Sequence, residues 1–230
     1  MAFLQHASVG GVRNGEAPVG LISNGAAVID QLILVRHGES EHHAANITGG
    51  WTDLPLTRLG QGQADSVGQE IQSLLRGCEA ALYCSDLLRA RQTAQKIGER
   101  LRLQVIAEPG LRELDNGVAK GRTREEAQSL LLPMTAPTID WVPYPGAESW
   151  RALNGRVVKC MQGIQTRDTK NIVIVSHANS LVCIVHWWLG IPEDMMSKIS
   201  YDFLPASITI LTVNSFGEKT VSLLNSTGHL

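Results

Sequence analysis

The stretch "LILVRHGES" at residues 32–40 joins a wholly apolar run to an arginine, a histidine and a glycine. A short, continuous apolar run is typical of a central parallel strand that is buried on both faces. We therefore expect a strand over residues 31–36, with Arg36 and His37 emerging where it ends. Gly38, which has no side chain, lets the backbone approach a neighbouring segment closely.

Apolar runs alternate with helical patterns along the rest of the chain. Further strands are expected over residues 81–85, 103–107, 171–176 and 207–213. Helices are expected over residues 57–77, 85–101, 149–166 and 180–189, with Thr57 and Ser85 as N-caps of the first two. This alternation predicts an α/β fold whose sheet is covered on both faces. In such folds, ligands bind outside the carboxyl ends of the parallel strands.

The composition is that of an ordinary globular domain. The chain has 230 residues, a formal net charge of -2 and 43% hydrophobic residues, which predicts one domain with a sizeable core. A near-neutral charge gives no broad surface for nucleic acid or an anionic membrane. Residues 1–30 lack helical or strand periodicity, so we expect a flexible extension there and the folded domain over residues 31–230.

Cysteines and hydropathy bear on the compartment. The four cysteines have neither CxxC pairs nor the Cys/His spacing of a metal site, which favours free thiols in a reducing cytoplasm. The N-terminus lacks the basic and apolar regions of a signal peptide. The most apolar stretch, residues 172–191, is interrupted by serines, histidines and an asparagine, so we do not expect it to span a membrane.

The ending of the first strand occurs a second time. In "VSHANS", His177 follows the strand expected over residues 171–176 just as His37 follows the first. Arg89 lies in the first turn of the helix after the second strand, and Glu113 lies in the loop after the third. Taken alone, Arg89 could be a solvated helix residue and Glu113 a loop ion-pair partner. All four side chains, with Arg36, are nevertheless expected at one edge of the sheet.

Together these residue types suit phosphoryl transfer. Two guanidiniums can each hold phosphate oxygens in a bidentate fork. One neutral imidazole can attack phosphorus and form a phosphohistidine, while a second, protonated by anionic surroundings, stabilises charge in the transition state. A carboxylic acid can protonate the leaving oxygen and then activate water.

The sequence resembles the histidine phosphatase, or phosphoglycerate mutase-like, superfamily. The matching stretches are "LVRHGES", "GGWTDLPLTRLG", "CSDLLRARQTA", "LREL", "PGAES" and "VSHANS", in the family's order. The resemblance implies a three-layer α/β/α sandwich with a mostly parallel central sheet. It also implies catalysis without metal or cofactor, and possession of the family's catalytic and substrate-binding residues. The implied catalytic residues are His37 as nucleophile, Arg36, Arg89 and His177 as phosphate pocket, and Glu113 as acid/base; the implied substrate-binding residues are His43, Gly50, Trp51, Ala178 and Asn179.

Two positions depart from the family pattern. His43 stands where related sequences commonly carry a pocket asparagine, and it could donate a hydrogen bond in its place. Ala178 follows His177 where the family commonly has glycine, which is tolerable if that residue has a negative φ. Neither departure removes a residue that performs the chemistry.

Three functions fit this pattern. The first is a metal-independent phosphomonoester hydrolase acting on a small phosphorylated metabolite. The second is a cofactor-dependent phosphoglycerate mutase, disfavoured because the segment after Glu113 looks too short for the mutase insertion and reads "ELDNG" instead of "ERHYG". The third is a non-catalytic phosphate-binding protein, for which a glutamate beside an anion would have no use. The family resemblance leaves a homodimer open, and the middle segment is expected to form the substrate lid.

Overall fold

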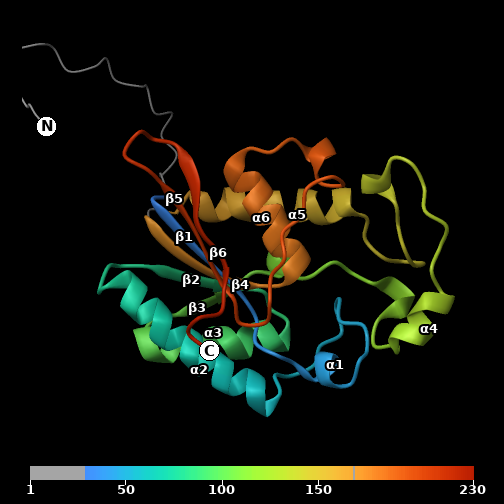
Figure 1. The fold of residues 1–230 in the computed structure, drawn as a ribbon, viewed down its shortest axis with the longest axis horizontal. Coiled ribbons are helices and arrows are strands. Elements are labelled where there is room, and N and C mark those ends of the chain that lie inside the picture. Colours follow the sequence, from blue (N-terminus) through green and yellow to red (C-terminus); the bar gives the residue numbers. More distant parts are fainter. Residues whose placement is uncertain (1–28, 168) are drawn as a thin grey trace, which may run out of the picture.

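The computed structural model describes residues 29–167 and 169–230. A six-stranded sheet of order β3-β2-β4-β1-β5-β6 forms the centre of the molecule (Figure 1). The strands β1 to β4 are mutually parallel, whereas β5 pairs antiparallel with both β1 and β6. The strands are β1 (Gln31–Arg36), β2 (Ala81–Cys84), β3 (Val105–Ala107), β4 (Asn171–Ser176), β5 (Ile208–Val213) and β6 (Lys219–Ser226).

Helices cover both faces of the sheet, which confirms the predicted three-layer α/β/α fold. In Figure 1, α2 and α3 lie on one side of the sheet and α5 and α6 on the other, while α1 and α4 lie beyond one end of it. The helices are α1 (Glu41–Ala44), α2 (Arg58–Leu75), α3 (Leu88–Leu101), α4 (Arg124–Ser129), α5 (Trp150–Gln165) and α6 (Ala178–Leu189), with short 3-10 turns η1 (Pro109–Leu111), η2 (Gly117–Ala119), η3 (Thr138–Asp140) and η4 (Glu193–Met195).

Strand β1 is apolar throughout because both of its faces are buried. Leu32 and Leu34 point into the core beneath α5 and α6, and Ile33 and Val35 point into the core beneath α2 and α3. All four side chains are fully buried. Successive residues of a strand point to opposite faces, so this run fills two cores at once and fixes the end of the strand in the middle of the sheet.

The helix caps agree only partly with the sequence. The Thr57 hydroxyl accepts the Gly60 N–H and begins α2 as predicted. The prediction of Ser85 as N-cap of α3 is wrong: the helix begins at Leu88 after Leu87, and the Ser85 hydroxyl accepts the Leu87 N–H instead. The Leu88 N–H is satisfied from outside the helix, by the Asp53 carboxylate at 2.6 Å. A distant partner thus replaces the local cap.

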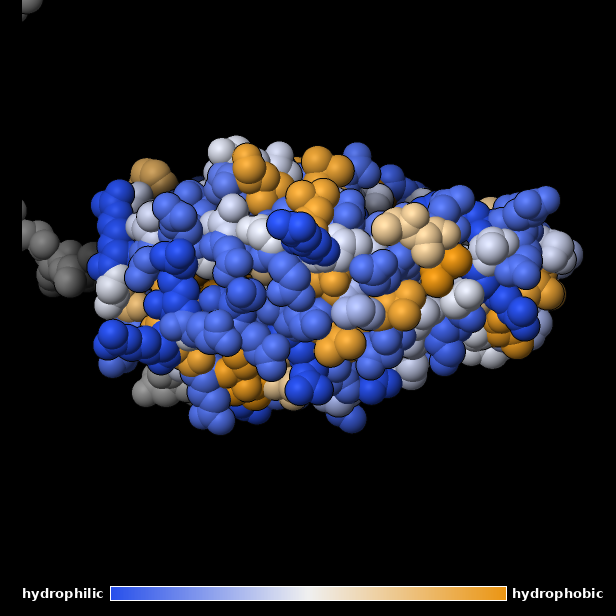
Figure 2. Space-filling view, turned by 90° about the horizontal axis from the view of Figure 1, so that it is seen from below, coloured by the Kyte–Doolittle hydropathy of each residue, from blue (hydrophilic) through white to orange (hydrophobic). Residues whose placement is uncertain are grey.

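One face of the molecule is formed by α2 and α3. Seen from the side on which α2 and α3 lie, it is largely hydrophilic, with apolar side chains in small groups (Figure 2). Among the described residues, no helix combines the length and apolar character needed to cross a membrane. The extension expected over residues 1–30 lies outside the described residues except for Ile29, which is buried in the core, and Asp30.

Candidate active site

Two neighbouring strands end in a histidine at the same edge of the sheet. β1 pairs in parallel with β4, with Arg36 opposite Ser176. The His37 N–H donates to the Ser176 carbonyl at 3.0 Å, and His177 directly follows Ser176. The two imidazole rings are therefore only 5.0 Å apart between their centroids. The strand ending that occurs twice in the sequence becomes one pair of side chains in space.

The imidazole of His37 has one preferred tautomer. Its Nδ1 lies 2.7 Å from the Gly38 carbonyl oxygen, which can only accept, so Nδ1 carries the proton and Nε2 keeps its lone pair. Burial, followed by the charge of Arg89, holds the pKa of His37 well below its usual range. The ring is therefore neutral at physiological pH, and a neutral ring is the form that attacks phosphorus.

Arg89 faces that lone pair. Its Nε donates to His37 Nε2 at 3.2 Å, and its terminal nitrogens donate to the carbonyl oxygens of Thr52 and Gly50 at 2.7 and 2.8 Å. The residue is 1% exposed, and burial lowers its pKa to about 10, so it stays charged at neutral pH. Among the described residues no carboxylate forms an ion pair with it. A buried cation whose partners are two carbonyl oxygens and a neutral imidazole attracts an anion.

Arg36 supplies the second guanidinium. It donates to the Phe203 carbonyl at 2.6 Å, and its other terminal nitrogen lies 2.8 Å from His43 Nε2. Its Nε is buried and has no partner among the described residues. Burial lowers its pKa, and the charge of Glu113 partly opposes that effect. Arg36 therefore brings a charge and an unused donor to the edge of the sheet.

Both ring nitrogens of His43 face hydrogen-bond donors, whereas a neutral imidazole has only one nitrogen that can accept. Its Nδ1 accepts the Ser40 N–H at 3.1 Å, so its proton sits on Nε2, and that N–H meets the Arg36 guanidinium, which can only donate. Burial and the Arg36 charge lower the pKa of His43 to about 4, which keeps the ring neutral. An anion oxygen between the two donors would satisfy both.

His177 is the N-cap residue of α6 and is fully buried. Neither ring nitrogen has a hydrogen-bond partner in the described part of the chain. The sequence predicted anionic surroundings that protonate this ring. The surroundings are instead cationic: burial, and then the charges of Arg89 and Arg36, hold the pKa of His177 well below its usual range. A bound anion would oppose these effects and raise the pKa of His177.

Glu113 lies in the loop after β3 and η1. Burial raises the pKa of its carboxyl group, and two hydrogen bonds and the Arg89 charge partly oppose the rise. Its Oε1 accepts the Leu114 N–H at 2.8 Å, and its Oε2 lies 3.4 Å from the Asn179 N–H, in the first turn of α6. A carboxyl group that keeps its proton to higher pH than usual suits a general acid.

Comparison with known proteins decides the family. The profile of the histidine phosphatase superfamily, branch 1, matches residues 32–227. The chain belongs to this superfamily. A probable phosphoglycerate mutase GpmB of Photorhabdus laumondii is 34% identical over 204 residues, which cover 83% of this chain and 94% of that protein. A protein of the same name from Serratia proteamaculans is 36% identical over 168 residues, or 70% of this chain and 76% of that protein.

Solved histidine phosphatase structures share the fold. A mycobacterial glucosyl-3-phosphoglycerate phosphatase superposes with a TM-score of 0.72 at 23% identity, over 86% of this chain and 100% of that one. A phosphoserine phosphatase of Entamoeba histolytica, solved with 3-phosphoglyceric acid, superposes with a TM-score of 0.67 at 27% identity, over 87% of this chain and 98% of that one. An α-ribazole phosphatase of Shigella flexneri gives 0.71 at 24% identity, over 85% and 96%.

Some residues that the histidine phosphatase motifs suggested for substrate binding have other contacts here. The Trp51 indole N–H donates to the Glu113 carbonyl oxygen at 2.6 Å, and its ring stacks against Arg112 at 4.7 Å. Gly50 has a positive φ of 51° and presents its carbonyl to Arg89. Both therefore position the candidate catalytic residues Glu113 and Arg89 in this structure, and their own contact with substrate stays a prediction. Ala178 begins α6 with a negative φ, so alanine is unstrained there.

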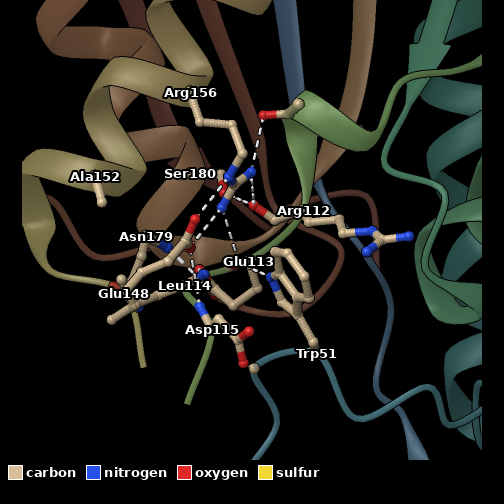
Figure 3. Close-up of polar contacts among 12 residues, drawn as sticks. Trp51, Arg112, Glu113, Leu114, Asp115, Glu148, Ala152, Arg156, Asn179 and Ser180 are labelled. Atoms are coloured by element: carbon tan, nitrogen blue, oxygen red, sulfur yellow. Dashed lines mark hydrogen bonds and ion pairs between the residues drawn. The ribbon is translucent and has the colours of Figure 1, made fainter. Parts of the chain in front are cut away.

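Arg156 is a positioning residue that the sequence did not single out. Figure 3 shows its guanidinium between Glu148 and the loop that carries Glu113. It donates to both oxygens of Glu148 at 2.9 and 2.8 Å, and to the carbonyl oxygens of Gly110, Arg112 and Glu113 at 3.0, 3.0 and 3.2 Å. Its spacing in α5 is that of any surface cation, and its partner Glu148 lies in the "PGAES" stretch just before the helix.

A close backbone approach supports the loop after His37. A Cβ atom built on Gly38 would lie 2.6 Å from the Gly60 carbonyl oxygen, so the start of α2 packs directly on this loop, as the sequence predicted for Gly38. The Gly38 N–H donates to the Thr93 hydroxyl of α3 at 3.2 Å. Within residues 29–167 and 169–230, no three His, Cys, Asp or Glu side chains cluster so as to hold a metal ion.

Proposed function

We propose that this histidine phosphatase superfamily member is a metal-independent phosphomonoester hydrolase that works through a phosphohistidine on His37. The observation that carries the proposal is the lone pair of His37 Nε2, fixed by the Nδ1 contact to Gly38 and facing the buried Arg89 guanidinium. A nucleophile beside an unneutralised cation is arranged for an anionic electrophile.

In the first step, the substrate phosphoryl group displaces the Arg89 contact to His37, so that the guanidinium binds phosphate oxygens instead. His37 Nε2 forms a bond to phosphorus as the bond from phosphorus to the alcohol oxygen breaks. Glu113 gives its proton to that oxygen and becomes a carboxylate. Arg36 and Arg89 neutralise charge on the equatorial oxygens, as a metal ion does in other phosphoryl-transfer sites.

In the second step, water attacks the phosphohistidine. The Glu113 carboxylate takes a proton from the water. The oxygen of the water bonds to phosphorus as the bond from phosphorus to Nε2 breaks. His37 returns to the neutral form and Glu113 to the acid. His177, whose ring nitrogens have no partner in the described part of the chain, is placed to bind a phosphate oxygen throughout, and the bound anion raises its pKa toward protonation.

The substrate class that we propose is a small phosphorylated metabolite. The structural relatives are phosphatases of glucosyl-3-phosphoglycerate, phosphoserine and α-ribazole phosphate by their names, and they share the fold but not one leaving group. We therefore propose that Arg36, Arg89 and His177 bind the phosphate group that such substrates share. The alcohol half of the substrate would contact the expected lid, residues 114–149. A screen against a panel of cellular phosphomonoesters identifies the alcohol.

A mutase is the second candidate, because the GpmB relatives are named as probable phosphoglycerate mutases. The two activities differ in what happens to 3-phosphoglycerate. A phosphatase releases inorganic phosphate and glycerate, whereas a mutase returns the phosphoryl group and yields 2-phosphoglycerate. Phosphorus NMR of one reaction supplied with 2,3-bisphosphoglycerate separates the products. If 2-phosphoglycerate forms faster than inorganic phosphate is released, the protein is a mutase and the proposed hydrolase activity is wrong.

The direct test of the hydrolase is turnover of p-nitrophenyl phosphate in the presence of EDTA. We expect phosphate release that EDTA leaves unchanged. No release at any pH from about 5 to 8, with vanadate binding intact, would contradict hydrolysis and support a non-catalytic phosphate-binding protein.

A further inference from the structure

A cavity lies beside the loop that carries Glu113. Its volume is about 540 Å³, within the range of pockets that hold small organic ligands. None of the catalytic candidates Arg36, His37, Arg89, Glu113 or His177 lines it. Its walls are Trp51, η1 and one face of α5, and its lining residues are Trp51, Glu108, Pro109, Gly110, Arg112, Arg156, Lys159, Cys160, Gly163, Ile164 and Arg167.

The floor of this cavity, which we name the α5 cavity, is apolar. Pro109 and Ile164 line it together with Cys160. Burial raises the pKa of Cys160 to about 11, so it remains a thiol and behaves as a small apolar side chain. η1 packs tightly here, since a Cβ atom on Gly110 would lie 2.6 Å from Cys160 Cβ.

The rim is cationic. Arg112, Arg156, Lys159 and Arg167 surround the floor, against one lining carboxylate, Glu108. Each arginine is in an ion pair, but Lys159 takes part in none among the described residues and is exposed. The Trp51 ring adds a flat aromatic wall, with Arg112 and Arg156 over it at 4.7 and 5.7 Å. An apolar floor with a cationic rim complements a molecule that is apolar at one end and anionic at the other.

We infer that the α5 cavity is a second binding site, for a small organic anion with a planar apolar body, and that its occupancy is coupled to Glu113. The coupling rests on the proposed function and on three side chains of the cavity wall. Trp51 and Arg156 both donate to the Glu113 carbonyl oxygen, and Arg112 precedes Glu113 in the chain (Figure 3). A ligand that draws either donor toward the cavity shifts the loop that holds the acid.

Two glycines of α5 give a matched pair of variants. Gly163 lines the cavity, whereas Gly155 does not. Both are exposed residues of the same helix, and a Cβ atom on either meets no atom within 4 Å. Gly163→Trp is therefore expected to place a bulky side chain at the cavity, and Gly155→Trp places the same side chain elsewhere on the helix. Circular dichroism and thermal unfolding verify that both variants fold.

The probe is 8-anilinonaphthalene-1-sulfonate, a planar apolar anion whose fluorescence rises on binding. We expect binding to the wild type and to Gly155→Trp, and at least about a tenfold weaker affinity for Gly163→Trp. Lys159→Glu should weaken binding as well, while Lys198→Glu, on an exposed lysine outside the cavity, should not. Equal binding by the two tryptophan variants, or none by the wild type, would overturn the inference. So would loss of a dimer in Gly163→Trp alone, which would make a second copy of the chain the occupant.

The coupling has its own measurement. Saturating probe should change the rate of p-nitrophenyl phosphate hydrolysis by the wild type and by Gly155→Trp, and leave Gly163→Trp unaffected. Equal inhibition of both variants would place the probe elsewhere and contradict the coupling. If the protein releases no phosphate at all, the proposed function fails while the binding experiment still tests the cavity.

Discussion

The Nε atom of Arg89 lies 3.2 Å from Nε2 of His37, so the lone pair that is available for attack on phosphorus is directed at a buried cation. β1 brings the imidazole to the edge of the sheet, and α3 brings the guanidinium. We expect a phosphate group that displaces this contact to bind the Arg89 guanidinium, with its phosphorus beside Nε2 of His37. The predictions below follow from this arrangement.

Lysine cannot replace Arg89, because a single ammonium group cannot hold two backbone carbonyl oxygens and two phosphate oxygens in one plane. We expect Arg89→Lys to lower kcat/KM for p-nitrophenyl phosphate by about 10²- to 10³-fold. Arg91→Lys, an exposed position of the same helix, should leave the rate near that of the wild type. Equal, small effects of both changes would remove Arg89 from the phosphate pocket.

Glu113→Gln removes the carboxyl group that we propose as the acid for the leaving group. Because burial raises the pKa of Glu113, the protonated form persists to higher pH than for an exposed glutamate, and hydrolysis of alkyl phosphates should fall as pH rises through that raised pKa. The glutamine variant should lose about 10²- to 10⁴-fold on alkyl phosphates and lose this limb of the pH profile. Nitrophenolate needs little protonation, so its loss should be smaller. Equal losses on both substrates would argue against the acid role.

His43 can be tested against the residue that the family commonly has. Its proton on Nε2 meets the Arg36 guanidinium, so we expect a phosphate oxygen to bind between them. His43→Asn keeps a donor and should retain most of the activity, whereas His43→Leu should raise KM for p-nitrophenyl phosphate. If leucine serves as well as asparagine, His43 does not contact the phosphate.

Arg156→Gln breaks the contacts that hold the Glu113 loop. Three backbone carbonyl oxygens and the Glu148 carboxylate lose their donor, so we expect the free energy of unfolding to fall by about 2–3 kcal/mol. Activity on alkyl phosphates should fall more than activity on p-nitrophenyl phosphate, because the acid is displaced. Arg151→Gln, on the exposed face of the same helix, is the matched control and should change neither quantity much. Uniform loss on both substrates would indicate a purely structural role.

The sequence predicted those parts of the structure that depend on the pattern of neighbouring residues in the chain. β1 and β4 are continuous apolar runs because each fills two cores, and the histidines after them meet because parallel neighbours end at one edge. β6 was not predicted, since much of it is exposed and its pairing with β5 holds it in the sheet. Trp188 is buried in the core beneath α6, and its neighbour Trp187 is half-buried and packs against that core.

What the sequence could not supply are contacts between distant segments. The Asp53 carboxylate satisfies the start of α3, which local cap preferences assigned to Ser85. Arg156 has the same helical spacing as many solvated cations. Its partners, the carbonyl oxygens of Gly110, Arg112 and Glu113, are backbone groups that no side-chain pattern marks. The neutral state of His177 depends on its burial beside two arginines, which only the assembled fold brings together.

The central claim is that His37 becomes phosphorylated, and rapid quenching under alkaline conditions tests it most directly. The protein is mixed with a phosphomonoester substrate, quenched within one turnover and digested for mass spectrometry, with His37→Ala as the control. We predict that His37 is phosphorylated in the quenched sample and that the phosphoryl group is lost in acid. The modification should be absent once the substrate is exhausted. Phosphate release with no phosphohistidine at His37, or equal turnover by His37→Ala, would contradict the account.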